Sequence, residues 1–177
     1  MKNLKIFLTW VMITAILLIP AISQANLSPD EFEKNTISIG VVVSDLEKSL
    51  DFYTKVIGMV KTSEFSVDEK FAKRSGLTDG TPFSVTVLKL ENNSQANQWK
   101  LLSFGKDANH PKQTTIMDDT GAQYITINVK SIKPFLERLK KHNIKILSDD
   151  GLKVGNGNLF VLIQDPDGTF IELMGPE

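Results

Sequence analysis

The order strand, helix, strand, strand, strand occurs twice in this chain, and this internal repeat limits the folds that are open to it. Shifting one half along the other by 86 residues aligns their apolar positions, so that Ile39 falls on Ile125 and Leu46 on Ile132. A unit of this kind cannot bury both its sheet and its helix alone. We therefore expect the two copies to share one hydrophobic core.

In the first half, capping and turn residues mark where the predicted elements begin and end. Asp45 is a good helix N-cap and Gly58 a good helix-ending residue, which predicts a helix from Glu47 to Val56. The irregular stretch 67–82 contains a short predicted helix, Glu69–Arg74, and is expected to form a lid or one wall of a cleft. Alternating and β-branched runs predict four strands: Thr36–Val43, Met59–Ser66, Phe83–Leu90 and Trp99–Phe104.

The second half repeats this order after a polar linker over residues 105–121. Ser131 is expected to cap a helix that has Pro134 in its first turn, where proline is tolerated. Five segments are predicted as strands: Tyr124–Val129, Ile144–Leu147, Leu152–Val154, Leu159–Gln164 and Phe170–Leu173. The sequence Asp165-Pro166-Asp167-Gly168 joins the last two strands, and its residue types predict a β-hairpin turn.

Residues 1–25 have the three-part pattern of a secretory signal peptide. Two lysines precede an apolar run over residues 6–19, and Ser23 and Ala25 are small residues at positions −3 and −1 of a cleavage site. A bilayer span needs about 20 apolar residues, so we expect cleavage after Ala25 rather than anchoring. The expected location is the periplasm or the exterior, with membrane contact only through the signal segment.

Charge and cysteine content exclude several functions. The chain has 20 Lys and Arg residues, 21 Asp and Glu residues and no basic run, which argues against a nucleic-acid partner. It has no cysteine, so an exported form would have neither disulfide bonds nor a thiol nucleophile nor a thiolate metal site.

Two blocks of sequence resemble the vicinal oxygen chelate superfamily, which includes glyoxalase I, bleomycin resistance proteins and extradiol dioxygenases. These blocks are Val43–Met59 and Asp165–Leu173, and the resemblance extends over about residues 36–175. It implies an α+β fold of two βαβββ modules that form a half-open, barrel-like sheet around a cleft. Module one would span about residues 36–104 and module two about 122–175, behind an N-terminal arm at 26–35. Because many members form dimers, the resemblance also implies a homodimer.

The resemblance also assigns four positions on the first and last strands of the two modules. In metal-dependent members these positions carry His or Glu ligands to a divalent ion, which holds two neighbouring substrate oxygens. Here they are Ser38, Lys100, Tyr124 and Glu172, and only Glu172 retains a usual ligand. A lysine ammonium has no acceptor and repels a cation. We therefore expect no metal cofactor, and we expect these four residues to line a cleft that binds a small organic molecule.

Two alternatives stay open. The chain could be a metal-dependent lyase, isomerase or dioxygenase of the glyoxalase type that uses Glu172 with unusual ligands. It could instead be a non-catalytic structural or partner-binding domain whose cleft is sealed by a Lys100–Glu172 ion pair, because buried charges need partners. Glutathione chemistry is not expected after export, since the main thiol pool is intracellular.

Other chemically able side chains have structural interpretations. Tyr53 lies on the apolar helix face and is expected to pack beneath the sheet. Arg74 would be solvated unless it meets an anionic substrate. His110 and His142 are the only histidines, and neither falls at a ligand position. Three aromatic residues are expected in the core, with a place in a pocket wall as the alternative: Phe71, Phe83 and Trp99.

The signal-peptide interpretation predicts that the exported protein begins at Asn26. Intact-mass spectrometry of protein recovered from the periplasm or medium should show a mass that corresponds to residues 26–177. A mass that includes residues 1–25 would contradict cleavage and favour an anchored protein.

Overall fold

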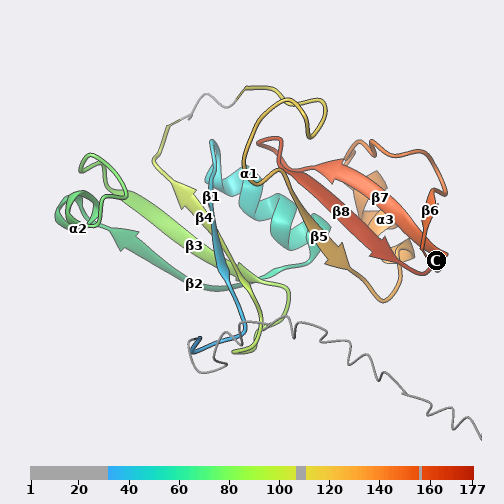
Figure 1. Ribbon diagram of the computed structural model, residues 1–177, viewed down its shortest axis with the longest axis horizontal. Helices are drawn as coiled ribbons and strands as arrows, with labels where there is room; N and C mark the ends of the chain where they lie inside the picture. Colours follow the sequence, from blue (N-terminus) through green and yellow to red (C-terminus); the bar gives the residue numbers. More distant parts are fainter. Residues whose placement is uncertain (1–31, 107–110, 156) are drawn as a thin grey trace, which may run out of the picture. The chain divides into compact units, whose positions relative to one another are not determined.

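The computed structural model describes residues 32–106, 111–155 and 157–177 (Figure 1). The chain divides into two compact units, Met1–Glu33 and Lys34–Glu177, and only the second is considered below. The predicted signal segment and His110 lie outside the described residues. Within the described ranges, no helix is long and apolar enough to cross a membrane.

The first module has the predicted order of elements. Its strands form one sheet in the order β1-β4-β3-β2, in which β1 is parallel to β4 and the other neighbours are antiparallel. A helix with two segments, α1 and η2, follows β1, and the short helix α2 follows β2. The elements are β1 (Ser38–Val42), α1 (Leu46–Asp51), η2 (Phe52–Ile57), β2 (Val60–Val67), α2 (Glu69–Arg74), β3 (Phe83–Lys89) and β4 (Gln98–Ser103).

The second module repeats this topology in a separate sheet of order β5-β8-β7-β6. Strands β5 and β8 are parallel, as β1 and β4 are in the first sheet. The α+β fold of two βαβββ modules is thus confirmed, whereas strands β1 and β5 do not pair and no closed barrel forms. Its elements are β5 (Tyr124–Asn128), α3 (Lys133–Lys141), β6 (Lys153–Val154), β7 (Asn158–Gln164) and β8 (Phe170–Gly175).

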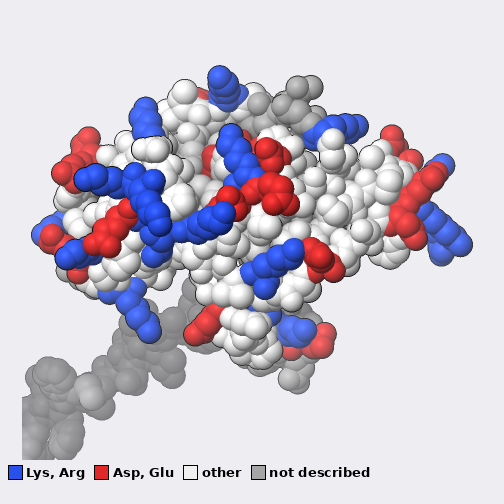
Figure 2. Space-filling model, turned by 180° about the vertical axis from the view of Figure 1, so that it is seen from behind, with Lys and Arg blue, Asp and Glu red and all other residues white. Residues whose placement is uncertain are grey.

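One hydrophobic core serves both modules, as the repeat predicts. Apolar residues of β1 and β4 and of β5 and β8 point to the same core as the buried faces of α1, η2 and α3. The helices therefore cover one face of each sheet; Figure 1 shows α3 behind β7 and β8. Figure 2 is seen from this helix-covered side, where Lys and Arg side chains are interspersed with Asp and Glu.

The local signals of the first helix act as predicted. The Asp45 carboxylate accepts a hydrogen bond from the backbone N–H of Lys48, which starts α1. After Asp51 the helix widens into a π-helical segment, η2, which ends at Gly58 with a φ of 92°. A positive φ favours glycine, so this residue is suited to close the helix.

Two local predictions in the second module are wrong. The N-cap of α3 is Ile132 rather than Ser131, and its backbone N–H donates to the carbonyl of Pro176 instead of starting a capping box. The segment Ile144–Leu147 is not a strand. Asn143 before it has a φ of 56°, and only single contacts tie the segment to β7, such as the N–H of Leu147 to the carbonyl of Leu162.

The two modules are joined by a buried hydrogen bond. The hydroxyl of Tyr53 in η2 donates to Oδ2 of Asp165, the first residue of the hairpin turn, at 2.7 Å. Tyr53 is fully buried, as predicted, and Asp165 is only 6% exposed. The other oxygen of Asp165 accepts the backbone N–H groups of Asp167 and Thr169, which fixes the turn.

Further polar contacts support this junction. Asp167 of the same turn accepts hydrogen bonds from the hydroxyls of Ser44 and Ser49 at the start of α1. From the other direction, Nε of Arg138 in α3 donates to the carbonyl of Val56 at the end of η2. The helix of each module thus makes hydrogen bonds to the other module. The junction depends on these hydrogen bonds as well as on apolar packing.

Substituting Tyr53→Phe is expected to lower the free energy of unfolding by about 1–3 kcal/mol, because it leaves the buried Asp165 without one donor. Tyr124→Phe is the matched control, since Tyr124 is 49% exposed and should change stability little. Urea unfolding followed by circular dichroism measures both. Equal effects of the two substitutions would contradict a stabilising role for the Tyr53 hydroxyl.

Burial raises the pKa of the Asp165 carboxyl above its ordinary value of 3.8, although hydrogen bonds from Tyr53 and Thr169 act to lower it. The folded chain therefore binds this proton more tightly than the unfolded chain, so the contribution of Asp165 to stability falls as pH rises through the raised pKa.

Wild type should consequently lose stability relative to Asp165→Asn as the pH rises from the ordinary carboxyl pKa of 3.8 through the raised pKa of Asp165. Urea titrations of both proteins across this range measure the difference. A difference that is constant or that moves in favour of wild type would show that the carboxyl is not held at a raised pKa.

Candidate ligand-binding site

The face of the first sheet that points away from the helices is mostly apolar. We call it the first open face; it is defined by the side chains that alternate with the core residues of β1 to β4. Strand register places these side chains in rows across the sheet. One row is Ser63, Val87, Lys100 and Gly40, and the next is Phe65, Val85, Leu102 and Val42.

The far end of this face is covered by α2. Ala72 of α2 is fully buried and belongs to a cluster with Val67, Phe83, Val85 and Val87, against which Leu102 and Phe104 pack. The Asp68 carboxylate caps α2 by accepting the N–H of Phe71 at 2.7 Å. The position of α2 is therefore compatible with the prediction that residues 67–82 form one wall of a cleft.

Lys100 is the charged residue in the middle of the first open face. Its neighbours across the sheet are Val87 on one side and Gly40 on the other. The side chain is half-buried and has neither an ion pair nor a hydrogen bond. Gly40 has no side chain, and a Cβ added there would come within 3.3 Å of one methyl group of Leu102, which is closer than an ordinary van der Waals contact.

The corresponding face of the second sheet, the second open face, is more polar. Tyr124 and Thr126 of β5 lie on it, opposite Phe170 and Glu172 of β8. Glu172 is half-buried, and its Oε2 accepts a hydrogen bond of 2.5 Å from the hydroxyl of Thr126. On the first sheet, Ser38 is exposed and donates to the side-chain oxygen of Gln98 at 3.0 Å.

The proposed Lys100–Glu172 ion pair does not form. The ion pairs within 4.0 Å in the described residues are Lys55–Asp51 and Lys61–Glu64. Lys100 and Glu172 lie on different sheets that share no strand pairing, and the carboxylate of Glu172 accepts a hydrogen bond from the Thr126 hydroxyl. The prediction that these two charges seal the cleft is therefore wrong.

The four family positions do not fit a divalent metal ion. They offer one carboxylate, two hydroxyls and an ammonium, whereas such sites use several carboxylates or imidazoles. Among the described residues, no group of three His, Cys, Asp or Glu residues could hold a metal ion. The only described histidine, His142, is the C-cap residue of α3.

A cavity of about 220 Å³ lies between the modules. It is lined by Ile39, Met59 and Trp99 of module one and by Ile125, Thr126 and Ile127 of module two, among others. None of the four predicted site residues lines it. However, Ile39 directly follows Ser38, and Thr126 holds Glu172, so the cavity lies beside two of the predicted positions.

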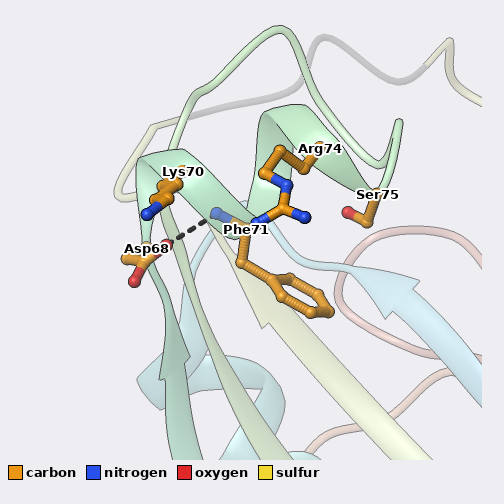
Figure 3. Close-up of a pocket in the computed structure, with 5 residues that line it drawn as sticks. All are labelled: Asp68, Lys70, Phe71, Arg74 and Ser75. Carbon is orange, nitrogen blue, oxygen red and sulfur yellow. Dashed lines mark hydrogen bonds between the residues drawn. The ribbon is translucent and has the colours of Figure 1, made fainter.

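A second cavity, of about 460 Å³, lies against α2 and is shown in Figure 3. Its lining includes Asp68, Lys70, Phe71, Arg74 and Ser75. In Figure 3 the Phe71 ring and the Arg74 guanidinium are directed to the same side of α2, whereas Lys70 is directed the other way. The arrangement places an aromatic face and a cation on one wall.

Of the three aromatic residues expected in the core, two are there. Phe83 and Trp99 are each only 6% exposed, and Phe83 packs against Phe104 with ring centroids 5.1 Å apart. Phe71 is 60% exposed, so its core assignment is wrong. The neighbouring Ala72 takes the buried side of α2 instead, and Phe71 takes the alternative place, in a pocket wall.

Comparison with known proteins identifies the family. The model of the glyoxalase/bleomycin resistance protein/dioxygenase superfamily matches residues 36–173. The chain belongs to this superfamily. Its matched region begins just before β1 and ends within β8, so it includes both modules.

Individual relatives are distant. The lactoylglutathione lyase of Escherichia coli O157:H7 is 25% identical over 134 residues, which are 75% of this chain and 85% of that protein. A lactoylglutathione lyase of Arabidopsis thaliana is 20% identical over 146 residues, which are 82% of this chain; the match spans only about half of that relative's length (46%).

Solved structures agree with the fold. A glyoxalase family protein from Bacillus cereus aligns with a TM-score of 0.68 at 16% identity, over 84% of this chain and 97% of that one. An antibiotic binding protein from Streptomyces sp. CB03234 aligns with a TM-score of 0.54 at 17% identity, over 81% and 97% of the two chains.

The sequence did not point to Gly40 or Thr126, which the strand register places beside Lys100 and Glu172. A signal for Thr126 was present, because it follows Tyr124 by two residues and so shares its face of the strand. Gly40 offered the same spacing from Ser38. The sequence alone does not show the strand pairing that places Gly40 opposite Lys100 and Thr126 opposite Glu172.

Proposed function

We propose that this chain is an exported, periplasmic or secreted member of the superfamily that binds a small organic molecule and does so without the metal of its enzymatic relatives. The binding surface is formed by the open faces of the modules, with Ser38, Lys100, Tyr124 and Glu172 as the polar groups. The partners are a small-molecule ligand and a second copy of the chain, with no nucleic acid.

The observation that supports this proposal is Lys100. A half-buried lysine side chain, with no ion pair or hydrogen bond to the described residues, occupies the position where metal-dependent members have a carboxylate ligand. Such a group disfavours a divalent cation and leaves a polar anchor on an apolar surface. A protein of similar fold, from Streptomyces sp. CB03234, is described as an antibiotic binding protein, which is consistent with a ligand-binding role for this fold.

A second candidate function is a metal-dependent enzyme of the glyoxalase type, acting as a lyase, isomerase or dioxygenase. Two observations favour it: lactoylglutathione lyases are among the relatives, and Glu172 retains the family's carboxylate. For such a reaction, Glu172 would have to bind the metal in place of the Thr126 hydroxyl, and the metal would need further ligands from other residues.

Binding is tested with the neutral fluorescent probe N-phenyl-1-naphthylamine and the mature protein. We expect saturable binding to wild type that is weakened at least about tenfold by Gly40→Leu, which adds a bulky side chain next to Lys100 on the open face. Val42→Trp is a second blocking variant on the same strand, at a position that is already 44% exposed. The control is Glu137→Leu, which places a leucine at an exposed position of α3 and should leave binding unchanged.

Two results would contradict the proposal. Binding that is absent from wild type, or insensitive to both blocking variants while these remain folded, would exclude the open face as the site. Stoichiometric divalent metal in the purified protein, measured by mass spectrometry and lost on Glu172→Ala, would establish the enzymatic alternative instead.

A further inference from the structure

The two open faces carry opposite charges. On the first, the rows around Lys100 contain Val42, Phe65, Val85, Val87 and Leu102. Neither row has an Asp or Glu among its described residues. On the second, the charge is that of Glu172, which the Thr126 hydroxyl already contacts. A ligand on the first open face therefore meets apolar carbon and one positive group.

The side chain of Lys100 is half-buried, and its charge has no partner among the described residues. Removing part of the water from a charge is unfavourable unless a partner replaces it. Within residues 32–106, 111–155 and 157–177, no carboxylate oxygen lies within 4.0 Å of the Lys100 ammonium and no acceptor is hydrogen-bonded to it. The next residues of its row, Val87 and Gly40, have no polar side-chain atoms. A bound anion would supply the missing partner.

The charged residues of α2 that line its cavity, Lys70 and Arg74, are cations. Arg74 is exposed, has no ion pair, and lies on the same side of α2 as the Phe71 ring (Figure 3). Of the residues lining this cavity, Asp68 is the acidic one, and its Oδ1 caps α2 through the N–H of Phe71. The element that covers the apolar end of the open face thus adds a second cation and an aromatic surface.

We propose that the ligand is a small organic anion with an apolar body. Its carboxylate or sulfonate group binds the Lys100 ammonium, and its apolar part lies against Leu102 and Val42, the accessible end of the neighbouring row, since Val85 is buried beneath α2. This assignment rests on the proposed function and specifies its ligand class. The Lys100 ammonium, at a position that carries a metal ligand in metal-dependent relatives, favours a negatively charged ligand.

A matched pair of probes tests the assignment. 8-Anilinonaphthalene-1-sulfonate and N-phenyl-1-naphthylamine share an apolar body and differ by one sulfonate group. We expect wild type to bind the anionic probe more tightly than the neutral one in fluorescence titrations. Lys100→Gln should weaken binding of the anionic probe about tenfold and leave the neutral probe unchanged. Lys140→Gln removes the same charge from exposed α3 and should change neither affinity.

Each other outcome has a defined meaning. If the neutral probe binds and Gly40→Leu blocks it, but Lys100→Gln does not alter the preference for the anion, the ligand class is wrong while the proposed function stands. If Arg74→Gln removes the preference and Lys100→Gln does not, the anion belongs to the α2 cavity and the assignment to Lys100 is overturned. If neither probe binds wild type, both proposals fail.

Discussion

The hydrogen bond between Tyr53 and Asp165 is the contact on which the arrangement of this domain depends. It joins the helix of module one to the last turn of module two, inside a core that both modules share. Asp165 also orders the turn through two backbone N–H groups, and β8 with Glu172 starts directly after that turn. The same carboxylate therefore sets both the junction and the position of a candidate site residue.

Short-range signals in the sequence were sufficient for most of the fold. Asp45, Gly58 and the Asp-Pro-Asp-Gly turn act within a few residues of themselves, so their effects follow from residue type alone. The wrong predictions depended on distant partners. Ser131 lost its capping role because Ile132 bonds to Pro176, and Phe71 lost its core position because Ala72 faces the cluster under α2.

The candidate site shows the same division. The family pattern and the alternation of strands place Lys100 and Glu172 on open faces, as the register confirms. Whether the two charges meet depends on how separate sheets lie, which no local pattern encodes. The choice of Thr126 as the partner of Glu172 likewise depends on parallel pairing between strands that are 46 residues apart at this point.

The superfamily fold is kept in this chain although three of the four candidate positions carry Ser, Lys and Tyr rather than His or Glu. The strands that carry metal ligands in enzymatic relatives are kept here, together with the turn that positions the last of them. The charge of Lys100 is compatible with the core because its side chain faces away from the shared apolar cluster.

The junction between the modules has a practical consequence. It consists of hydrogen bonds and apolar contacts, and the chain has no cysteine. Reducing agents therefore cannot break the connection, and oxidants cannot trap a mispaired form. Protein folded under reducing conditions and protein folded under oxidising conditions should therefore have the same contact between their modules, and either preparation is suitable for testing ligand binding.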